Sequence, residues 1–451
     1  MFSPKLNIVM DLSVNIKSIV SKNKKIFLFI ITVLLIYLSC GMPPRQDSQG
    51  PVEVTFWHAM AGQHLKVVND IADEFEKLHP DIKITPVYQG SYDALHQKLV
   101  ASLTSGTQPS MAQMYESWTT RFLERNLVEP VENFFHPKDG KDGFTKDDLN
   151  DIFPVFLSNS TWAGKVVTLP FNKSAYMLFY NKEMLLENGF ESPPKDWDEF
   201  LEQAKKITVA SEGKITRYGY ATRPFIEGLT VFLFLNEQKY LSDDGSAFLM
   251  GEPGNVETFK FVVDLVQKYK VAYVESDYLT SAFGSKKIAM YIGSTASFPY
   301  NDKAVGNKFT WLAAPMPASP EKKGKALFQG TNIGIFSNID SKEREAAWLF
   351  LKFLTNTKNA TRWSIETGYL PIRRSCLEQP EMKAYLASNP NYKIVLTQID
   401  RGMFEPRFVF WESIRDNITR EFESALNGTK TVEEAIRTLD RKCNFILKTE
   451  R

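Results

Sequence analysis

The sequence predicts an α/β protein of two lobes, in which each lobe is a mostly parallel sheet flanked by helices. Apolar and polar residues alternate at 52–56, as in a strand, and apolar residues recur at helical spacing over 68–78. The same order repeats at 82–84 and 95–103, and a second set of units follows at 177–180, 197–207, 218–221 and 256–269. Strands that alternate with helices along the chain predict parallel pairing, with helices on the faces of the sheet.

The length of the chain indicates two hydrophobic cores. About 410 residues remain once the N-terminal segment is set aside, which exceeds what one core usually spans. Two capping patterns, Asp340 with Glu343 and Thr431 with Glu434, predict where two further helices begin. The last third of the chain is therefore expected to be largely helical.

Composition and charge are those of a soluble globular protein. Hydrophobic residues make up 43% and charged residues 24%, and the formal net charge is +1 with both signs interspersed. A nucleic-acid partner or a broad membrane-binding face would need a strongly basic surface, which this balance argues against. Any anion that the protein binds must therefore be held by a local group of donors.

The first 39 residues are expected to be a signal peptide. Lys22, Lys24 and Lys25 precede an unbroken apolar stretch at 26–38. As a helix this stretch would extend about 20 Å, which is short of a bilayer core of about 30 Å. The pattern therefore indicates export and cleavage rather than a stable membrane span.

Cys40 follows a small residue at the end of the apolar stretch, and this arrangement resembles the lipobox of bacterial lipoproteins. The resemblance implies that Cys40 is acylated and becomes the mature N-terminus, with the polar residues 40–51 as a tether, since several acyl chains give a firm anchor. Tyr37 stands where those signals usually carry an aliphatic residue, so a chance cysteine near an ordinary cleavage site is the alternative. Cys376 and Cys443 would then be the remaining thiols, either joined in a disulfide or buried and free.

No catalytic, metal or cofactor motif stands out. The chain has no Gly-x-Ser-x-Gly, His-Glu-x-x-His, Gly-x-x-x-x-Gly-Lys or Cys-x-x-Cys pattern. His58 and His64 are six residues apart, a spacing that fits no standard metal site. We therefore predict no enzyme activity, no metal and no cofactor, although the carboxylate pair of a secreted glycoside hydrolase needs no local signature.

Five segments, in shared order and spacing, resemble the extracellular solute-binding proteins of ABC importers, in the maltose-binding-like family 1. They are Thr-Phe-Trp-His-Ala-Met at 55–60, Pro-Phe-Asn-Lys-Ser at 170–174, Tyr-Asn-Lys at 180–182, Pro-Pro-Lys-Asp-Trp at 193–197 and Thr-Gly-Tyr-Leu-Pro-Ile at 367–372. More narrowly, they are similar to the glycerol-3-phosphate-binding branch of that family. The similarity covers nearly all of the chain after about residue 52.

The resemblance implies a two-lobe fold of the periplasmic-binding-protein (Venus flytrap) type, which closes on a small solute and presents it to a membrane permease. Lobe 1 is expected at 52–170 and 310–356, and lobe 2 at 171–309 and 357–451. The crossovers between the lobes are expected near 170–171, at 309–313 and after 346–354. The same resemblance implies an exported monomer, periplasmic or at the cell surface, that is anchored to the membrane through Cys40.

Seven positions match the ligand-contacting residues of the glycerol-3-phosphate-binding branch: Tyr92, Glu116, Ser174, Ser294, Gly330, Tyr369 and Arg415. The resemblance implies that Arg415 offers a planar fork to two phosphate oxygens, and that Glu116 accepts hydrogen bonds from glycerol hydroxyls. The serine hydroxyls and the Gly330 amide would complete the anion site. Taken alone, each position has another interpretation: core-edge tyrosines, capping serines, a glycine that the backbone needs, and a salt bridge between Glu116 and Arg415.

The chain departs from that branch after the strand at 218–221. A tryptophan-rich turn closes over the glycerol in the branch, whereas Thr-Arg-Pro-Phe-Ile stands here at 222–226. Arg223 and Phe225 would form the specificity wall, as a second positive contact and a stacking surface, or else both point to solvent. We expect a glycerol-3-phosphate or glycerophosphodiester ligand, with a sugar or oligosaccharide as the alternative. A secreted hydrolase and a surface adhesin are the less favoured functions.

Overall fold

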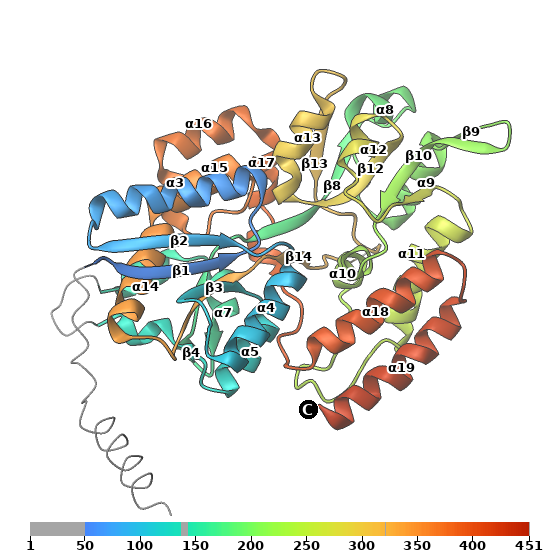
Figure 1. Cartoon of the computed structure of the whole chain (residues 1–451). Helices are drawn as coiled ribbons and strands as arrows, with labels where there is room; N and C mark the ends of the chain where they lie inside the picture. Colours follow the sequence, from blue (N-terminus) through green and yellow to red (C-terminus); the bar gives the residue numbers. More distant parts are fainter. Residues whose placement is uncertain (1–49, 137–142, 321, 451) are drawn as a thin grey trace, which may run out of the picture. The chain divides into compact units, whose positions relative to one another are not determined.

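Two mixed sheets with helices on their faces organise the chain in the computed structural model (Figure 1). The structure describes residues 50–136, 143–320 and 322–450. The expected signal peptide at 1–39, Cys40 and nearly all of the tether lie outside the described residues. Among the helices that are described, none is long and apolar enough to cross a membrane.

The first sheet contains the strand–helix units expected at 52–103. Its strand order is β2-β1-β3-β15-β4, with β7 paired to β15. β1 pairs in parallel with β2 and β3, whereas β15 runs antiparallel to β3, β4 and β7. The strands are β1 (Val52–His58), β2 (Ile82–Tyr88), β3 (Met111–Met114), β4 (Val128–Glu129), β7 (Leu169–Pro170) and β15 (Asn332–Phe336).

Helices cover both faces of the first sheet. On one face, Val68, Ile71 and Phe75 of α3 are buried in a core that also contains residues of α14 and α15. On the other face, Leu95 of α4 and Trp118 of α5 belong to a separate apolar cluster. These helices are α3 (Gly62–Leu78), α4 (Tyr92–Ser105), α5 (Glu116–Glu124), α14 (Ser341–Leu354) and α15 (Thr357–Thr367).

The second sheet has the strand order β11-β10-β12-β8-β14-β16, with β13 paired to β8 and β9 to β10. β10 is parallel to β11 and β12, but β8 is antiparallel to β12, β13 and β14. Both sheets are therefore mixed, and the second also has a parallel pair, β14 with β16, from distant parts of the chain. The strands are β8 (Ser174–Asn181), β9 (Val209–Ser211), β10 (Lys214–Thr222), β11 (Ala272–Val274), β12 (Ile288–Ser294), β13 (Trp311–Ala314), β14 (Ala326–Gln329) and β16 (Gly402–Met403).

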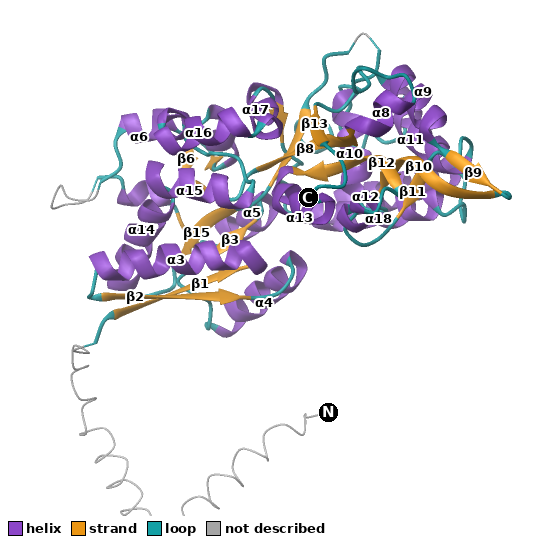
Figure 2. Ribbon diagram, turned by 90° about the horizontal axis from the view of Figure 1, so that it is seen from above, coloured by secondary structure: helices purple, strands orange, loops and turns teal. Residues whose placement is uncertain are grey.

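The second sheet shares one core with helices from two separate parts of the chain, 182–267 and 411–449, and most of these helices are labelled around the sheet in Figure 2. They are α8 (Lys182–Glu187), α9 (Trp197–Ile207), α10 (Ile226–Leu235), α11 (Pro253–Gln267), α18 (Trp411–Leu426) and α19 (Val432–Thr449). The other described elements are η1 (Val131–Phe134), α6 (Lys146–Asp151), α7 (Pro154–Asn159), β5 (Thr161–Trp162), β6 (Lys165–Val166), α12 (Thr280–Gly284), η2 (Thr295–Ser297), α13 (Phe298–Val305), η3 (Arg374–Glu378), α16 (Pro380–Ser388), α17 (Pro390–Leu396) and η4 (Ile399–Arg401).

The chain passes between the two sheets at segments that touch each other. β7 leads into β8 through 171–173, near the expected crossover at 170–171, and β14 leads back into β15 through 330–331. The expected lobe 1 segment 310–356 is thereby divided between the sheets, because β13 and β14 both pair with β8. α15, which opens the segment expected in lobe 2, packs on α3 of the first sheet. The assignment of whole segments to lobes stays a prediction.

Cys376 and Cys443 are free thiols, and both are buried. Cys376 lies in the core that contains α3 and α15, and Cys443 lies in the core of the second sheet. Of the two interpretations left open by the sequence, the structure therefore has the buried free thiols.

Candidate functional site

A cavity of about 330 Å³ lies where elements of both sheets meet. Both β2 and β3 are parallel to β1, and the helices that follow them, α4 and α5, begin at the cavity. Ligands of open α/β sheets bind at the carboxyl ends of such strands. The lining residues are Ser91, Tyr92, Asp93, Tyr115, Glu116, Ser117, Trp118, Tyr176, Arg223, Phe225, Glu227, Phe328, Gln329, Phe404, Glu405, Pro406, Trp411, Glu412 and Arg415.

Helix starts place the residues that come from the first sheet. The Ser91 side chain accepts a hydrogen bond from the Ala94 amide at 3.2 Å, so Tyr92 is the first residue of α4. Glu116 is the first residue of α5, where the helix dipole favours a negative charge. The two helix starts, held next to each other by the parallel strands β2, β1 and β3, therefore place a phenol and a carboxylate in the wall of one cavity.

Arg415 lies between two carboxylates. Its Nε donates to Glu405 at 3.0 Å, and its Nη2 donates to Glu227. Gln329 donates to both glutamates at 3.3 Å, and Trp411 donates to Glu405 at 3.2 Å. The three charged groups are one cation and two anions, so we call them the acidic triad, with a net charge of −1. The Arg415 side chain is 27% exposed, and the two glutamates are less exposed.

The charges of the acidic triad shift one another's pKa values. Burial acts against the charge on Arg415, but Glu227 and Glu405 outweigh it and raise the pKa of Arg415 well above its usual value. Burial likewise acts against the ionised form of Glu227, but Arg415 lowers the pKa of this carboxyl overall. Burial raises the pKa of Glu405 against the lowering effect of Arg415, and the Glu227 charge adds to the rise. Glu405 is therefore the carboxyl that is easier to protonate.

Glu116 pairs with a different cation. Its carboxylate accepts from Lys173 Nζ at 3.3 Å, and Lys173 is fully buried. The sequence left a salt bridge between Glu116 and Arg415 as an alternative. In the structure the two residues belong to separate ion-paired groups: Glu116 pairs with Lys173, and Arg415 belongs to the acidic triad.

The structure brings together five of the nine residues that the sequence pointed to. Tyr92, Glu116, Arg223, Phe225 and Arg415 all line the cavity. The remaining four lie elsewhere in the described part of the chain.

Ser294 lines a smaller adjoining chamber of about 80 Å³, which shares Tyr176, Arg223, Phe225 and Glu227 with the main cavity. The Ser294 side chain also accepts from the Ala296 amide at 3.3 Å, as a capping serine does.

Ser174, Gly330 and Tyr369 are not among the residues that line either cavity. They lie around the crossover segments: Ser174 pairs with Gln329 in the sheet, and Gly330 contacts the backbone of Asn172. The ring of Tyr369 stacks on that of Trp363, with centroids 5.5 Å apart.

Contacts with neighbouring residues hold Arg223, a residue of the expected specificity wall, in place. The Arg223 guanidinium lies 4.5 Å from the centroid of the Phe225 ring and 4.8 Å from that of Tyr278. Its Nη2 donates to the Ser276 carbonyl at 2.8 Å. Arg223 and Phe225 therefore face the cavity in a fixed arrangement, stabilised by cation–π contacts.

Sequence reasoning missed Glu227, Glu405 and the aromatic residues Tyr176 and Trp411. Glu227 stands two residues after Phe225, in the first turn of α10, and its position directly after the expected specificity wall is the sequence signal that marks it. Glu405 lies in an irregular segment between β16 and α18, where no local pattern marks it.

No metal site is evident in the described ranges, where no group of three or more His, Cys, Asp or Glu residues is placed to hold an ion. Burial lowers the pKa of His58 to about 4, and its Nδ1 accepts from the Met60 amide at 3.2 Å. His96 stacks on Trp118 with ring centroids 4.4 Å apart. These histidines are packing residues of the first sheet.

Residues 70–391 match the family model described as bacterial extracellular solute-binding protein. The chain belongs to this family. It is 27% identical over 420 residues to the sn-glycerol-3-phosphate-binding periplasmic protein UgpB of Pectobacterium atrosepticum, which covers 89% of this chain and 92% of the relative. It is 28% identical over 419 residues to UgpB of Salmonella typhimurium, covering 88% and 92%.

Solved structures show the same two-lobe fold. UgpB from Mycobacterium tuberculosis in complex with glycerophosphocholine has a TM-score of 0.79 at 21% identity, over 89% of this chain and 100% of that chain. The GacH receptor of Streptomyces glaucescens, solved unliganded and with acarbose, has a TM-score of 0.75 at 20% identity, over 88% and 98%. This member of the family is therefore an exported or periplasmic solute-binding protein of the ABC importer type, not an enzyme.

Proposed function

We propose that this solute-binding protein binds a glycerophosphodiester whose alcohol half carries a cationic group, and delivers it to an ABC permease. The observation that carries the proposal is the acidic triad: a guanidinium suited to phosphate oxygens stands between two carboxylates in the cavity wall. The names of the UgpB relatives support a glycerol phosphate group in the ligand.

Charge favours the diester over free glycerol-3-phosphate. Five carboxylates and two guanidiniums line the cavity, so negative charge is in excess. Two like charges about 4 Å apart repel by about 4 kcal/mol at an effective dielectric constant near 20, and by about 1 kcal/mol in water. A phosphomonoester brings nearly two negative charges to Arg415, whereas a diester with an ammonium group brings no net charge. The neighbour solved with glycerophosphocholine contains such a ligand.

A sugar or oligosaccharide is the second candidate. Tyr92, Tyr115, Trp118, Tyr176 and Trp411 give the cavity an aromatic wall on which sugar rings stack. The surplus carboxylates are good acceptors for hydroxyl groups, and the acarbose-binding neighbour has the same fold.

Isothermal titration calorimetry with glycerophosphocholine, glycerol-3-phosphate and maltose tests the proposal. We expect glycerophosphocholine to bind with an affinity in the micromolar range, about −8 kcal/mol, and glycerol-3-phosphate to bind more weakly. Arg415→Ala should remove the binding of both phosphates, whereas Arg420→Ala, a control on the same helix, should not. Heat from maltose alone would overturn the phosphate ligand.

We also propose that the mature protein is lipid-anchored. The support is the sequence alone: a short apolar segment that ends at Cys40, followed by a polar tether. Cys40→Ser should move the exported protein from the membrane fraction to the soluble fraction. Mass spectrometry of the mature N-terminus checks the lipid directly, and an unmodified N-terminus at another residue would contradict it.

A further inference from the structure

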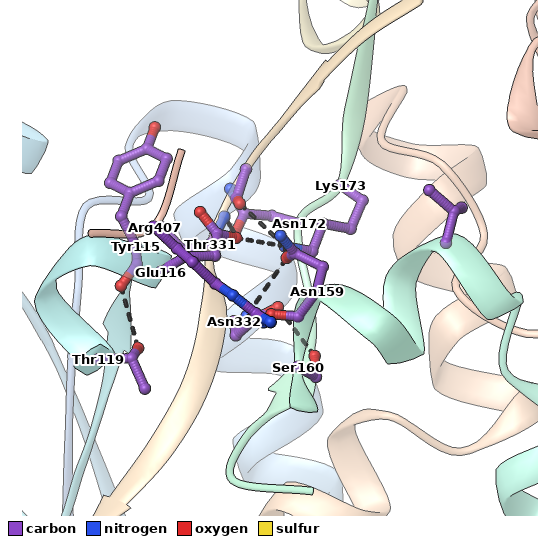
Figure 3. Close-up of polar contacts among 12 residues, drawn as sticks. Tyr115, Glu116, Thr119, Asn159, Ser160, Asn172, Lys173, Thr331, Asn332 and Arg407 are labelled. Atoms are coloured by element: carbon purple, nitrogen blue, oxygen red, sulfur yellow. Dashed lines mark hydrogen bonds and ion pairs between the residues drawn. The ribbon is translucent and has the colours of Figure 1, made fainter. Parts of the chain in front are cut away.

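Lys173 is a cation without contact to solvent in the first crossover segment, and its polar contacts are drawn in Figure 3. Its Nζ donates to Asn159 Oδ1 at 2.7 Å, to the Gly330 carbonyl at 3.0 Å and to Glu116 Oε1 at 3.3 Å. The ammonium also lies 4.8 Å from the centroid of the Phe404 ring. The partners come from four separate segments, and two of them, Glu116 and Phe404, line the cavity.

The surroundings of Lys173 join the crossover segments to the cavity. The Lys173 carbonyl accepts from the Leu370 amide at 2.6 Å, so this one residue contacts the segment at 367–372 as well as the segment at 330–331. Its neighbour Asn172 donates to the Tyr92 hydroxyl at 2.7 Å and accepts from the Thr331 amide at 3.1 Å.

We propose that Lys173 is a positioning residue, whose buried ammonium fixes the orientation of the Glu116 carboxylate in the cavity and cancels its charge there. Lys173 is the cation that lies within 4.0 Å of Glu116 in the described part of the chain. The Glu116 side chain is only 9% exposed, and a carboxylate at that depth without a counter-ion is strongly disfavoured. Loss of the ammonium would therefore displace Glu116 or add a full negative charge beside the acidic triad.

Proton loss from Lys173 has the same effect as its removal. Burial lowers the pKa of Lys173 to about 8, against the raising effect of Glu116. The other groups in contact with the ammonium, the Asn159 amide, the Gly330 carbonyl and the Phe404 ring, do not titrate. The affinity for an anionic phosphate such as glycerol-3-phosphate should therefore fall as pH rises through about 8, because the cavity then gains one negative charge.

Two measurements test the inference. The first is the free energy of unfolding by urea for the wild type, Lys173→Met, Glu116→Gln and the double variant, with the exposed Lys205→Met as control. We expect Lys173→Met to be clearly destabilising and Glu116→Gln to reverse much of that loss in the double variant. Additive effects of the two substitutions would overturn the inference, and this arm does not depend on the ligand.

The second measurement rests on the proposed function. Calorimetric affinities for glycerol-3-phosphate, which is anionic throughout this range, are compared between pH 6.5 and pH 9.5. We expect the wild type to weaken by about tenfold with a midpoint near pH 8, and Glu116→Gln to lose this midpoint, because the carboxylate that raises the Lys173 pKa is gone and burial lowers that pKa further. A purely structural lysine would affect stability but leave the two pH profiles parallel, which would overturn the inference. If the wild type binds neither glycerol-3-phosphate nor glycerophosphocholine at any pH, the proposed function fails and the unfolding cycle alone decides the role of Lys173.

Discussion

Glu405→Gln separates the candidate ligands by the sign of its effect. Glu405 accepts from Arg415 at 3.0 Å, and a glutamine of the same shape retains an acceptor while it removes the charge. The acidic triad then changes from a net charge of −1 to neutral. A phosphate bound at Arg415 would lie about 4 Å from the removed charge, where the repulsion is about 1 kcal/mol in the water-like limit and about 4 kcal/mol at an effective dielectric constant near 20.

The water-like limit sets the minimum effect, because Arg415 is partly exposed. We expect the affinity for glycerol-3-phosphate to rise at least about fivefold in Glu405→Gln. The affinity for glycerophosphocholine should rise less or fall, since its ammonium group loses a carboxylate partner. The affinity for maltose should fall, because a charged acceptor of hydroxyl hydrogen bonds is lost.

The assay is calorimetric titration of all three ligands at low and high salt, with Glu423→Gln, an exposed residue of the helix α18 that carries Arg415, as the control. The gain for glycerol-3-phosphate should shrink at high salt, because the interaction is between charges. Weaker binding of glycerol-3-phosphate to Glu405→Gln than to the wild type would refute the reasoning that places phosphate at Arg415.

The remaining predictions concern stability. Arg415→Ala should lower the free energy of unfolding by about 2 kcal/mol at pH 7, because Glu227 and Glu405 lose their counter-ion; the loss is less than for a fully buried ion pair. The pKa values of both glutamates in the folded variant then lie above those in the unfolded chain, so the loss of stability should shrink towards pH 4. An equal loss for Arg420→Ala in urea unfolding would contradict this prediction. Gly330→Ala should lower the free energy of unfolding by more than about 2 kcal/mol, because a Cβ at φ +109° would lie 1.9 Å from the Asn172 carbonyl oxygen in the facing crossover. Gly213→Ala, where a Cβ would meet nothing within 4 Å, should lower it by about 1 kcal/mol. Equal losses in the two variants would refute the close contact at Gly330. The thiols of Cys376 and Cys443 should react with Ellman's reagent only after unfolding, because both are buried and burial raises the pKa of Cys443 to about 12. Prompt reaction of these two thiols in the native protein would disprove this prediction.

The sequence predicted those parts of the fold that local periodicity determines. The parallel pairing of β1 with β2 follows from an uninterrupted strand–helix–strand unit, and this prediction is confirmed. The antiparallel partners β13, β14 and β15 were not predicted, because each pairs with a strand more than 100 residues away in the sequence. No periodicity within a segment specifies such a partner, and the return of the chain from the second sheet to the first at 330–331 depends on these pairings.

Capping motifs show the same limit on a smaller scale. Thr431 and Glu434 form the predicted reciprocal capping box at the start of α19. At α14 the Asp340 side chain accepts from the Lys342 amide, but Glu343 instead accepts from the Ser110 hydroxyl of a distant segment. The tertiary partner therefore overrides the local motif.

The candidate site divides in the same way. Arg415, Glu116 and Tyr92 could be placed from the order of motifs, but the charges that decide how Arg415 behaves could not. Glu227 and Glu405 are separated from it by 188 and 10 residues along the chain, and only the fold brings both against one guanidinium.

The two ion-paired groups together constrain the ligand more than any single residue does. The ammonium of Lys173 offsets the charge of Glu116, so the acidic triad determines the charge that a ligand meets at Arg415. A compact anion gains one guanidinium there but faces two carboxylates that it cannot displace without leaving them unpaired. A ligand that presents phosphate oxygens to Arg415 and an ammonium or hydroxyl group to Glu227 and Glu405 leaves no charge unpaired. Under the proposed function, the arrangement would therefore select for a solute with both kinds of group, and one arginine within an acidic surround would be compatible with a phosphate ligand.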